Sequence, residues 1–339
     1  MSPAPQPPPH APILELTFAT VLSRALYALV QRGVLDMLAA GPATPDEVAA
    51  KVGGHPVAML QTLRALASVG IFSHGSDGRF GLTTVGETLV SGHPTAAREL
   101  VLTFGAPGFW TAFGEMPRVL ETGRTGVELA FGMSAFDYLR AHPEEEAVFN
   151  RTMIAVHGGE PAAVAAAYDF SGVGTVVDVG GGLGTMLVTL LQHNPALSGV
   201  LFDAPTVVQA ARDTIAGAGL EGRCEWVGGD FFTAVPAGGD AYVLSHIIHD
   251  WNVDQCHTIL RNCRDAMNPG GRILIVEMVL PPGPEPHPGK LLDLIMLTIP
   301  GGRERTAEEY AELLAPVGLR VARVVPTASP VSVVEAVPV

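Results

Sequence analysis

The sequence predicts an α/β protein with a doubly wound, mostly parallel sheet in its second half and a helical domain with a small β-wing in front of it. Three observations support this prediction. The chain has 339 residues, which is more than one ordinary domain needs. From residue 174 onward, short β-branched runs alternate with helical runs. The first third shows helical spacing of apolar residues and then two short apolar runs around a turn.

Composition narrows the class of protein. Hydrophobic residues make up 47% and charged residues 16%, so we expect large cores and further burial between domains or subunits. The formal net charge is −14, from 34 acidic and 20 basic residues. Because phosphate binding needs clusters of Lys and Arg, this balance argues against a nucleic-acid partner.

The cysteines and the N-terminus suggest a cytoplasmic protein. Cys224, Cys256 and Cys263 form no CxxC pair, and their odd number does not suggest a disulfide framework, so we expect buried, reduced thiols. Residues 1–12 are rich in proline and contain no Lys or Arg, unlike a signal peptide. We expect this segment to be a disordered lead-in.

Residues 13–104 are predicted to form the first domain. An apolar helix is expected over 13–38, and because Glu15 and Arg24 interrupt its apolar start, we interpret it as a buried helix and not a membrane span. Thr44 followed by proline and two acids predicts the start of the next helix.

A winged helix follows from the order of the next elements. Helices are expected at 45–52 and 56–69, and two short strands at 71–72 and 79–82 flank an Asp-Gly turn. Such a fold often binds DNA, but its second helix carries only Arg64 as a base. We therefore expect a dimerisation domain, and a homodimer built through it.

Residues 105–170 are predicted to be a helical linker that contributes to a substrate pocket. The segment is rich in aromatic residues and methionine, which typically line pockets for small molecules. Candidate substrate contacts, from this segment and from the later chain, are Phe109, Trp110, Met153, His157, Met296 and Ile299.

Residues 171–339 are predicted to form the second domain. Five strands separated by helices are expected at 175–179, 199–202, 224–227, 241–244 and 272–276. The last two apolar runs, 320–325 and 331–337, have no helix between them. They can therefore pair antiparallel at one edge of the sheet.

A glycine-rich turn follows the first of these strands. Asp178 is followed by Gly180, Gly182 and Gly184 in a GxGxG pattern, which differs from the GxGxxG of dinucleotide-binding folds. Glycines permit a tight turn and let a ligand lie against bare backbone. A nucleoside without phosphates, such as S-adenosylmethionine (SAM), fits this turn, and the following helix N-terminus can face its carboxylate.

Two acids follow the next two strands. Asp203 can accept hydrogen bonds from both ribose hydroxyls, although it could instead cap the helix that begins at Pro205. Asp230 could accept from an adenine amino group, with Phe231 packed on the ring.

A histidine and two glutamates should reach one cleft at the carboxyl ends of the strands. His249 follows the fourth strand, Glu277 ends the fifth, and Glu304 precedes a later helix. A histidine paired with carboxylates suits a general base, although a lone histidine is often structural. His246 and His249 would face opposite sides of a strand, which argues against a metal shared between them.

Other residues near these positions are expected to have supporting roles. We interpret His246 as a wall of the cleft or a neighbour of the working groups. Arg303 and Arg305 are expected to be exposed to solvent or paired with local acids.

Taken in order, these motifs resemble the plant caffeic-acid-type O-methyltransferases and their bacterial relatives in natural-product pathways. The resemblance spans nearly the whole chain, and its conjunction of motifs is specific. It is carried by VVDVGGGLG at 176–184, FD at 202–203, GDFF at 229–232, HDW at 249–251, VE at 276–277 and GGRERT at 301–306. GVLDML and LRALASVGI in the first domain also resemble that family's dimerisation domain.

The resemblance implies a Rossmann-like methyltransferase fold and a set of roles. His249 corresponds to the family's general base, Glu277 and Glu304 to the pair that flanks it, and Asp250 to the acid beside it. The cofactor contacts implied are Gly180, Asp203, Asp230 and Phe231. The family needs no metal.

Two positions depart from the plant pattern. Ser245 stands where plant members have a lysine near the adenine, so the adenine contacts should differ. Ile299 stands where the caffeic-acid enzymes have an asparagine that reaches the substrate ring oxygens. The second difference argues against a phenylpropanoid substrate but not against the reaction.

The resulting prediction is a SAM-dependent methyl transfer to a hydroxyl, expected to be phenolic, of a small aromatic or polyketide-like metabolite, with S-adenosylhomocysteine as the other product. Two alternatives remain. A methyltransferase-like scaffold could use SAM for hydroxylation, decarboxylation or cyclisation, and a winged-helix regulator could sense SAM. No membrane or nucleic-acid partner is expected.

Overall fold

The computed structural model describes residues 8–339, and most of the expected disordered lead-in lies outside them. The chain folds as two compact units. Unit 1 holds the described residues up to Thr111 together with Leu139–Val156, and unit 2 holds Ala112–Tyr138 and His157–Val339. The stretch 105–170, which the sequence suggested as one linker, is therefore divided between the two units.

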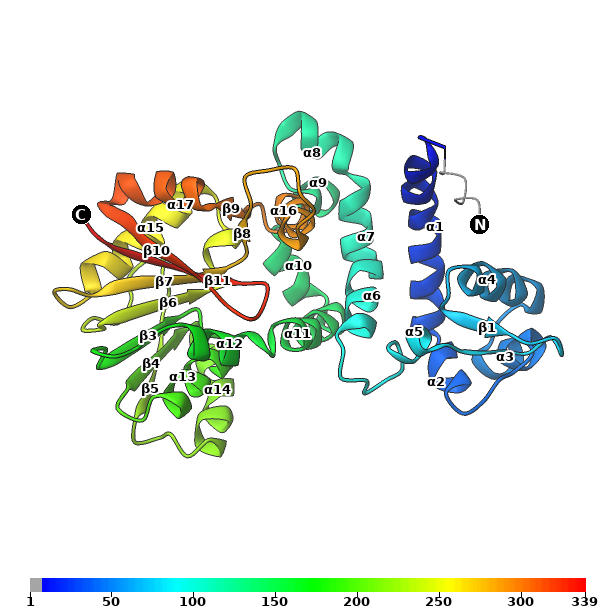
Figure 1. Ribbon diagram of the computed structural model, residues 1–339, viewed down its shortest axis with the longest axis horizontal. Helices are drawn as coiled ribbons and strands as arrows, with labels where there is room; N and C mark the ends of the chain where they lie inside the picture. Colours follow the sequence, from blue (N-terminus) through cyan, green and yellow to red (C-terminus); the bar gives the residue numbers. More distant parts are fainter. Residues whose placement is uncertain (1–7) are drawn as a thin grey trace, which may run out of the picture. The chain divides into compact units, whose positions relative to one another are not determined.

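The sheet of unit 2 has seven strands in the order β10-β11-β7-β6-β3-β4-β5 (Figure 1). The first five in sequence run parallel, and β11 pairs antiparallel with both β10 and β7. The strands are β3 (Thr175–Val179), β4 (Ser198–Asp203), β5 (Cys224–Gly228), β6 (Ala241–Ser245), β7 (Arg272–Glu277), β10 (Leu319–Pro326) and β11 (Ser332–Pro338). The predicted fold class is confirmed, including its antiparallel edge.

Helices cover both faces of this sheet because its central strands are apolar on both faces. One core includes residues of α12 (Glu160–Ala167), α13 (Thr185–His193) and α14 (Pro205–Gly217). The other includes residues of α15 (Val253–Ala266) and α17 (Ala307–Leu314). In Figure 1 these two sets of helices lie on opposite sides of the strands.

Shorter elements complete unit 2 or cross the division between the units. They are α7 (Pro107–Gly114), α8 (Met116–Thr122), α9 (Gly126–Phe131), α10 (Ala135–Ala141), η1 (Ile248–Asp250), β8 (Val279–Leu280), α16 (Pro288–Thr298), β9 (Arg305–Thr306) and η2 (Ala315–Val317). The short strands β8 and β9 pair parallel with each other, apart from the main sheet.

Unit 1 contains the predicted winged helix. Thr44 forms a capping box with Glu47, which accounts for the helix start that the sequence indicated. The wing pairs Phe72 with Leu82 in antiparallel register. The elements are α1 (Ala11–Gln31), α2 (Val34–Leu38), α3 (Pro45–Val52), α4 (Pro56–Ser68), β1 (Phe72–His74), β2 (Phe80–Leu82), α5 (Thr84–Glu87), α6 (Ala97–Gly105) and α11 (Pro143–His157).

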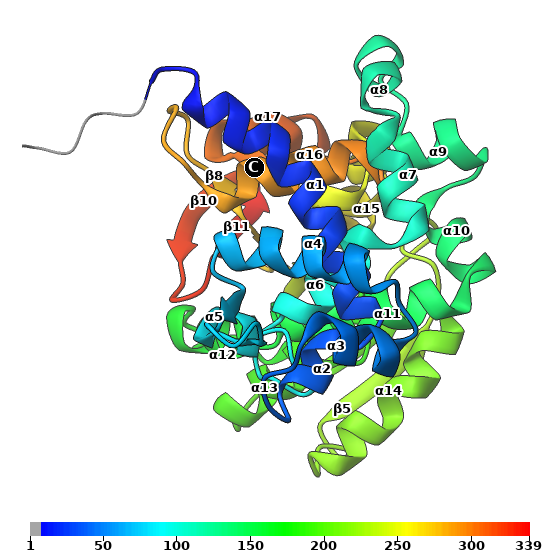
Figure 2. The ribbon, with the colours of Figure 1, turned by 90° about the vertical axis from the view of Figure 1, so that its right-hand side faces the viewer.

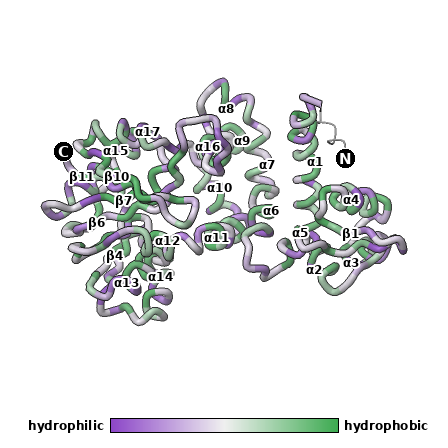
Figure 3. Tube along the Cα trace, in the orientation of Figure 1, coloured by the Kyte–Doolittle hydropathy of each residue, from purple (hydrophilic) through white to green (hydrophobic). Residues whose placement is uncertain are grey.

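The first helix differs from its prediction in two ways. The single helix expected over 13–38 is interrupted at Gly33, which has φ 73° and separates α1 from α2. The helix was also expected to be buried. Within a single chain this is wrong, since Leu16 is 77% and Phe18 62% exposed. Figure 2 shows α1 leading down to the helices of the winged helix, and Figure 3 shows its apolar character.

By length and composition alone, α1 is apolar enough to cross a membrane. Its mean hydropathy reaches 1.6 in an 18-residue window, of which 17% is buried. A helix that packs against a partner protein passes the same test, and a dimerisation helix is apolar for the same reason.

Candidate active site

His249 lies in the turn η1, directly after β6, and its side chain is buried. Its Nδ1 donates a hydrogen bond to Glu304 Oε1 at 2.6 Å. A carboxylate on Nδ1 fixes the orientation of the imidazole and, when the ring is neutral, leaves the lone pair on Nε2. Nε2 lies 3.6 Å from Asp250 Oδ1, which is too long for a strong hydrogen bond.

Glu277 holds the backbone of this turn instead of the imidazole ring. Its Oε1 accepts the backbone N–H of His249 at 2.9 Å, and the hydroxyl of Tyr310 donates to its Oε2. The two glutamates, expected to flank the base as a pair, therefore contact it differently. Sequence reasoning missed Tyr310, which lies inside the otherwise ordinary helix α17.

The carboxylates around His249 determine its charge. Burial alone would lower the pKa of His249, but Asp250, Glu304 and Glu277 together raise it to about 10. Burial in turn raises the pKa of the Glu277 carboxyl. In the absence of a ligand, the imidazole of His249 is therefore expected to be protonated on both nitrogens at neutral pH.

A buried arginine also hydrogen-bonds to the same turn. This contradicts the expectation that Arg305 would be exposed to solvent or paired with local acids. Arg305 is fully buried, and its Nη1 donates to the carbonyl of Ile248 at 3.3 Å. Cys256 Sγ lies 3.7 Å from Arg305 Nη2 and donates to the same carbonyl. Arg303 follows its prediction, since it lies 3.8 Å from Glu309. Arg305 is buried because it lies on β9, and no pattern in the local sequence indicates this burial.

Close backbone contact explains one glycine of the GGRERT segment. A Cβ built on Gly302 would lie 1.8 Å from the carbonyl oxygen of His249 and 2.6 Å from the carbonyl carbon of Asp250. The loop that carries Glu304 can therefore approach η1 only with glycine here. Asp293 on α16 also accepts the backbone N–H of Glu304 at 2.8 Å.

The glycine-rich turn has the geometry that its sequence predicted. Gly180, Gly182 and Gly184 have φ of 71°, 57° and 80°, in the left-handed region that favours glycine. A Cβ on Gly182 would meet no atom within 4 Å, so the turn leaves open space there. The backbone N–H of Gly182 donates to Asp203 Oδ2 at 2.9 Å.

The strand-end acids have different environments. Asp203 is half-buried and binds the glycine turn, and the helix after it has Ala204 at its N-cap with no side-chain cap. The interpretation of Asp203 as the cap of this helix is therefore wrong. Asp230 is exposed and accepts the backbone N–H of Phe232 at 2.9 Å.

Aromatic rings surround the same turn. Phe231 packs edge-on against Trp251, with ring centroids 5.9 Å apart, and lies near Gly180. Ser245 is half-buried at the end of β6. These groups form a coherent set of candidate contacts with a nucleoside.

Asp178 lies beneath the turn and faces no solvent. Its carboxyl is fully buried, neither oxygen has a hydrogen-bond partner, and a Cβ on Gly181 would lie 2.6 Å from Oδ2. Burial, together with the charge of Asp203, raises its pKa to about 7.

The candidate substrate contacts are divided between the two units. Phe109 and Trp110 pack inside unit 1, where Phe109 stacks on Phe149 and Trp110 lies under the guanidinium of Arg24. Met153 is half-buried in the same unit. His157 is half-buried in unit 2, where Met296 and Ile299 are buried in or next to α16.

His246 is placed differently from its prediction. β6 ends at Ser245, so His246 is not on a strand, and its ring lies 5.2 Å from that of His249 instead of on an opposite face. Its Nε2 donates to the buried Glu160 at 2.7 Å, and His157 Nδ1 lies 3.1 Å from the same Glu160 oxygen. Sequence reasoning missed Glu160, because only the fold brings it to His246.

Comparisons with known proteins agree with this fold. The family model of the O-methyltransferase domain matches residues 113–320, and that of the O-methyltransferase dimerisation domain matches residues 14–92. A phenazine O-methyltransferase, PhzM of Lysobacter antibioticus, is 42% identical over 96% of each chain.

Two further relatives differ in the reactions that their names state. The structure of NcsB1, an O-methyltransferase from neocarzinostatin biosynthesis in complex with SAM and 2-hydroxy-5-methyl naphthoic acid, has a TM-score of 0.80 at 34% identity. It covers 94% of this chain and 96% of its own. Aclacinomycin 10-hydroxylase RdmB of Streptomyces purpurascens is 34% identical over 89% of this chain and 82% of its own.

The chain belongs to the O-methyltransferase family, with the family's dimerisation domain at its N-terminal end. It is a SAM-dependent O-methyltransferase, similar to bacterial enzymes of natural-product biosynthesis. The predicted family, fold class and cofactor are thereby confirmed.

Proposed function

We propose that this enzyme methylates a phenolic hydroxyl of a small, fused or substituted aromatic acceptor, with His249 as the general base. The observation that carries the proposal is the buried imidazole held through Nδ1 by Glu304, which leaves Nε2 to receive a proton. The aromatic acceptor class is supported by relatives that act on phenazine and bind a naphthoic acid.

The residues around the glycine turn fit a SAM molecule. Open space over Gly182 and the carboxylates of Asp203 and Asp230 suit a nucleoside with a ribose and an adenine amino group. Phe231 and Ser245 would complete the adenosyl contacts, and Gly180 and Gly184 would shape the turn. When bound, SAM supplies the methyl group on a sulfonium whose positive charge also disfavours protonation of nearby imidazoles.

The side chains of the site have separate tasks in this proposal. His249 Nε2 accepts the hydroxyl proton of the acceptor as its oxygen becomes the nucleophile. Glu304 stabilises the resulting imidazolium. Glu277 keeps the turn η1 in place, because its carboxylate accepts the backbone N–H of His249. Asp250, 3.6 Å from Nε2, stabilises the same positive charge through space.

Substitution of His249 tests the role of the base. We expect His249→Gln to lower the methyl-transfer rate on a weakly acidic hydroxyl by about 10²–10⁴-fold, the usual contribution of a general base. SAM affinity should change little, because the candidate cofactor contacts lie on the glycine turn and the neighbouring strand ends. Single-turnover rates and calorimetric titration with SAM measure the two effects separately.

The matched control is His193→Gln, an exposed histidine at the end of α13 that bonds only its own helix. It should retain the parent rate. A His249 variant with nearly the parent rate on a non-acidic hydroxyl would show that another group removes the proton.

We also propose a homodimer formed through the N-terminal domain, in the cytoplasm. The match to a dimerisation domain over residues 14–92 and the exposed apolar side chains of α1 support the dimer. Buried free cysteines suit a reducing compartment.

Hydroxylation is the second candidate reaction, because a 34% identical relative is a hydroxylase. Stoichiometry separates the two reactions. Methyl transfer gives one S-adenosylhomocysteine for each modified acceptor, whereas hydroxylation takes its oxygen atom from an added oxidant such as O₂ and leaves SAM intact. Mass spectrometry of both products with a panel of phenolic acceptors decides between them.

A further inference from the structure

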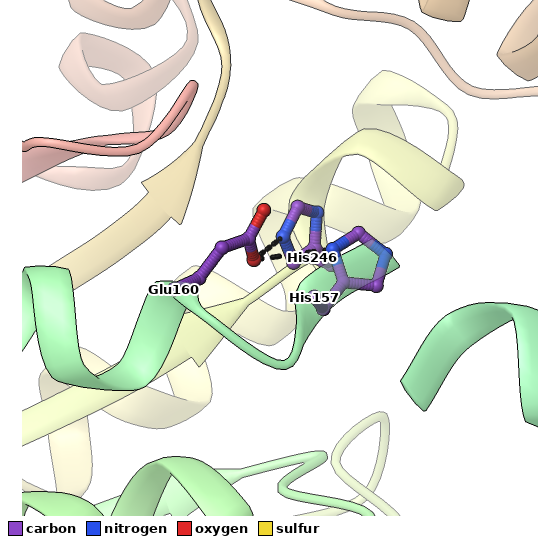
Figure 4. Close-up of side chains that lie close together, drawn as sticks. All are labelled: His157, Glu160 and His246. Atoms are coloured by element: carbon purple, nitrogen blue, oxygen red, sulfur yellow. Dashed lines mark hydrogen bonds and ion pairs between the residues drawn. The ribbon is translucent and has the colours of Figure 1, made fainter. Parts of the chain in front are cut away.

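Three side chains of unit 2, each at the end of a different element, meet next to His249. His157 ends α11, Glu160 begins α12, and His246 follows β6 (Figure 4). His157 Nδ1 and His246 Nε2 both lie within hydrogen-bond distance of Glu160 Oε2, at 3.1 and 2.7 Å. The three donor atoms all lie within 4.8 Å of one another.

The cluster is built into the fold and is not a chance surface contact. Glu160 is only 4% exposed, and the side chain of His246 is 13% exposed. His246 has φ 55°, the only non-glycine residue in residues 8–339 with a positive φ. Such a backbone is strained for a residue with a side chain, so the surrounding structure must hold it in place.

The charge of the cluster is incompletely balanced. Glu160 is a buried carboxylate that accepts two hydrogen bonds, which keep it ionised. Within the described part of the chain, no Lys or Arg forms a salt bridge with it, and its only partners of that kind are the two histidines. The buried Glu160 carboxylate therefore has no permanently charged cation as a partner.

Two imidazole nitrogens and one carboxylate oxygen form a typical donor set for first-row transition ions. Zn²⁺ and Co²⁺ bind these ligands, whereas Mg²⁺ and Ca²⁺ prefer oxygen ligands alone. Donors of a tetrahedral ion with bonds of about 2.0–2.1 Å lie roughly 3.3 Å apart. The two hydrogen-bonded pairs, at 2.7 and 3.1 Å, would therefore open slightly on binding.

We propose that His157, Glu160 and His246 bind a divalent first-row transition ion of the Zn²⁺ or Co²⁺ type, beside the methyl-transfer site. The ion replaces the hydrogen bonds within the cluster and neutralises the Glu160 carboxylate. The side chain of His157 is 26% exposed, so solvent or a ligand can supply the fourth position. The site does not depend on which residue is the general base.

Cobalt titration of the full-length protein tests this site. After dialysis against a chelator, Co²⁺ is added and its visible d–d absorption is followed. One equivalent should bind with the intense bands of a four- or five-coordinate ion, and Zn²⁺ should displace it. Glu160→Gln and His246→Asn should each weaken binding by about tenfold or more, because three protein ligands become two.

Two further variants keep the result interpretable. His157→Asn removes the most exposed ligand, so it retains the fold even if the buried substitutions do not, and it should weaken binding as well. His193→Asn removes a surface histidine on α13 and should bind Co²⁺ like the parent. Circular dichroism and S-adenosylhomocysteine affinity confirm that each variant is folded.

Two outcomes would overturn the site. Absence of stoichiometric binding at millimolar Co²⁺ would mean that the three residues form a hydrogen-bonded cluster only. Binding that survives in His157→Asn and His246→Asn but disappears in His249→Gln would place the ion on the proposed base and Asp250 instead.

Discussion

The carboxylates around His249, the proposed base, should shift the pH range of the reaction upward. The pKa of His249 is raised to about 10 by three acidic neighbours, and only the neutral imidazole can accept a proton. We therefore expect the methyl-transfer rate on a weakly acidic hydroxyl to rise with pH, with a midpoint above the ordinary imidazole value of ~6.5. Glu304→Gln should move this midpoint downward.

Rates measured under saturating SAM, from pH 6 to 10, give the midpoint. An acceptor phenol that ionises at low pH serves as the control, because its rate should depend less on the base. A midpoint at or below that of free imidazole would mean that the carboxylates do not hold a proton on His249 during turnover.

Asp178 gives a second prediction at the scale of single residues. Its pKa is raised to about 7 by burial, so its neutral form favours folding at low pH and this contribution is lost as pH rises through 7. We expect Asp178→Asn to raise the free energy of unfolding relative to the parent at pH 8 by roughly 2–4 kcal/mol more than at pH 5.

Urea unfolding of the SAM-free protein at the two pH values measures this difference. Asp230→Asn is the matched control, since that carboxyl is exposed and should show little change between the two pH values. Equal effects of Asp178→Asn at pH 5 and pH 8 would contradict a buried, ionisable carboxyl.

At the scale of elements, the loop before β9 and the turn η1 depend on each other. Gly302 lies so close to the His249 carbonyl that any Cβ would overlap it. We expect Gly302→Ala to separate the loop from η1, disturb the contact between Glu304 and His249, and lower kcat by about tenfold or more. SAM affinity should be retained, and Gly114→Ala, which meets no atom within 4 Å, should be close to neutral.

The sequence predicted most elements because their signals are local. β-branched runs gave the parallel strands within one or two residues, and Thr44 marked the start of α3. Burial of Arg305 and the meeting of Glu160 with His246 were missed, because each depends on elements far apart in sequence. The predicted side of His246 was wrong because β6 ends at Ser245, one residue before His246, and the backbone of His246 is left-handed.

At the scale of the whole molecule, the exposed face of α1 should control assembly. Leu16 and Phe18 are 77% and 62% exposed, within a segment that matches a dimerisation domain. We expect Leu16→Glu combined with Phe18→Glu to convert a dimer into a monomer, because two buried charges would oppose the apolar contact. Light scattering of the intact chain measures the change.

A control for this substitution is available on α14, at exposed Asp213. Asp213→Lys changes the net charge by two units in the opposite direction without touching α1, and should leave the parent dimer intact. A parent chain that is monomeric, or that requires detergent to remain in solution, would contradict the proposed assembly.

The order of strands in the sheet also leads us to expect an order of folding. β11 follows β10 in the chain but lies between β10 and β7, so the edge of β7 stays uncovered until residues 332–338 have been made. Ser332 pairs with Glu277, the residue that anchors the turn of His249. We therefore expect a nascent chain to form the glycine-rich turn at 180–184 before the turn of His249 is fixed by insertion of the last hairpin. Relative to the full-length chain, ribosome-bound chains arrested before residue 332 should retain more of their SAM binding than of their methyl transfer.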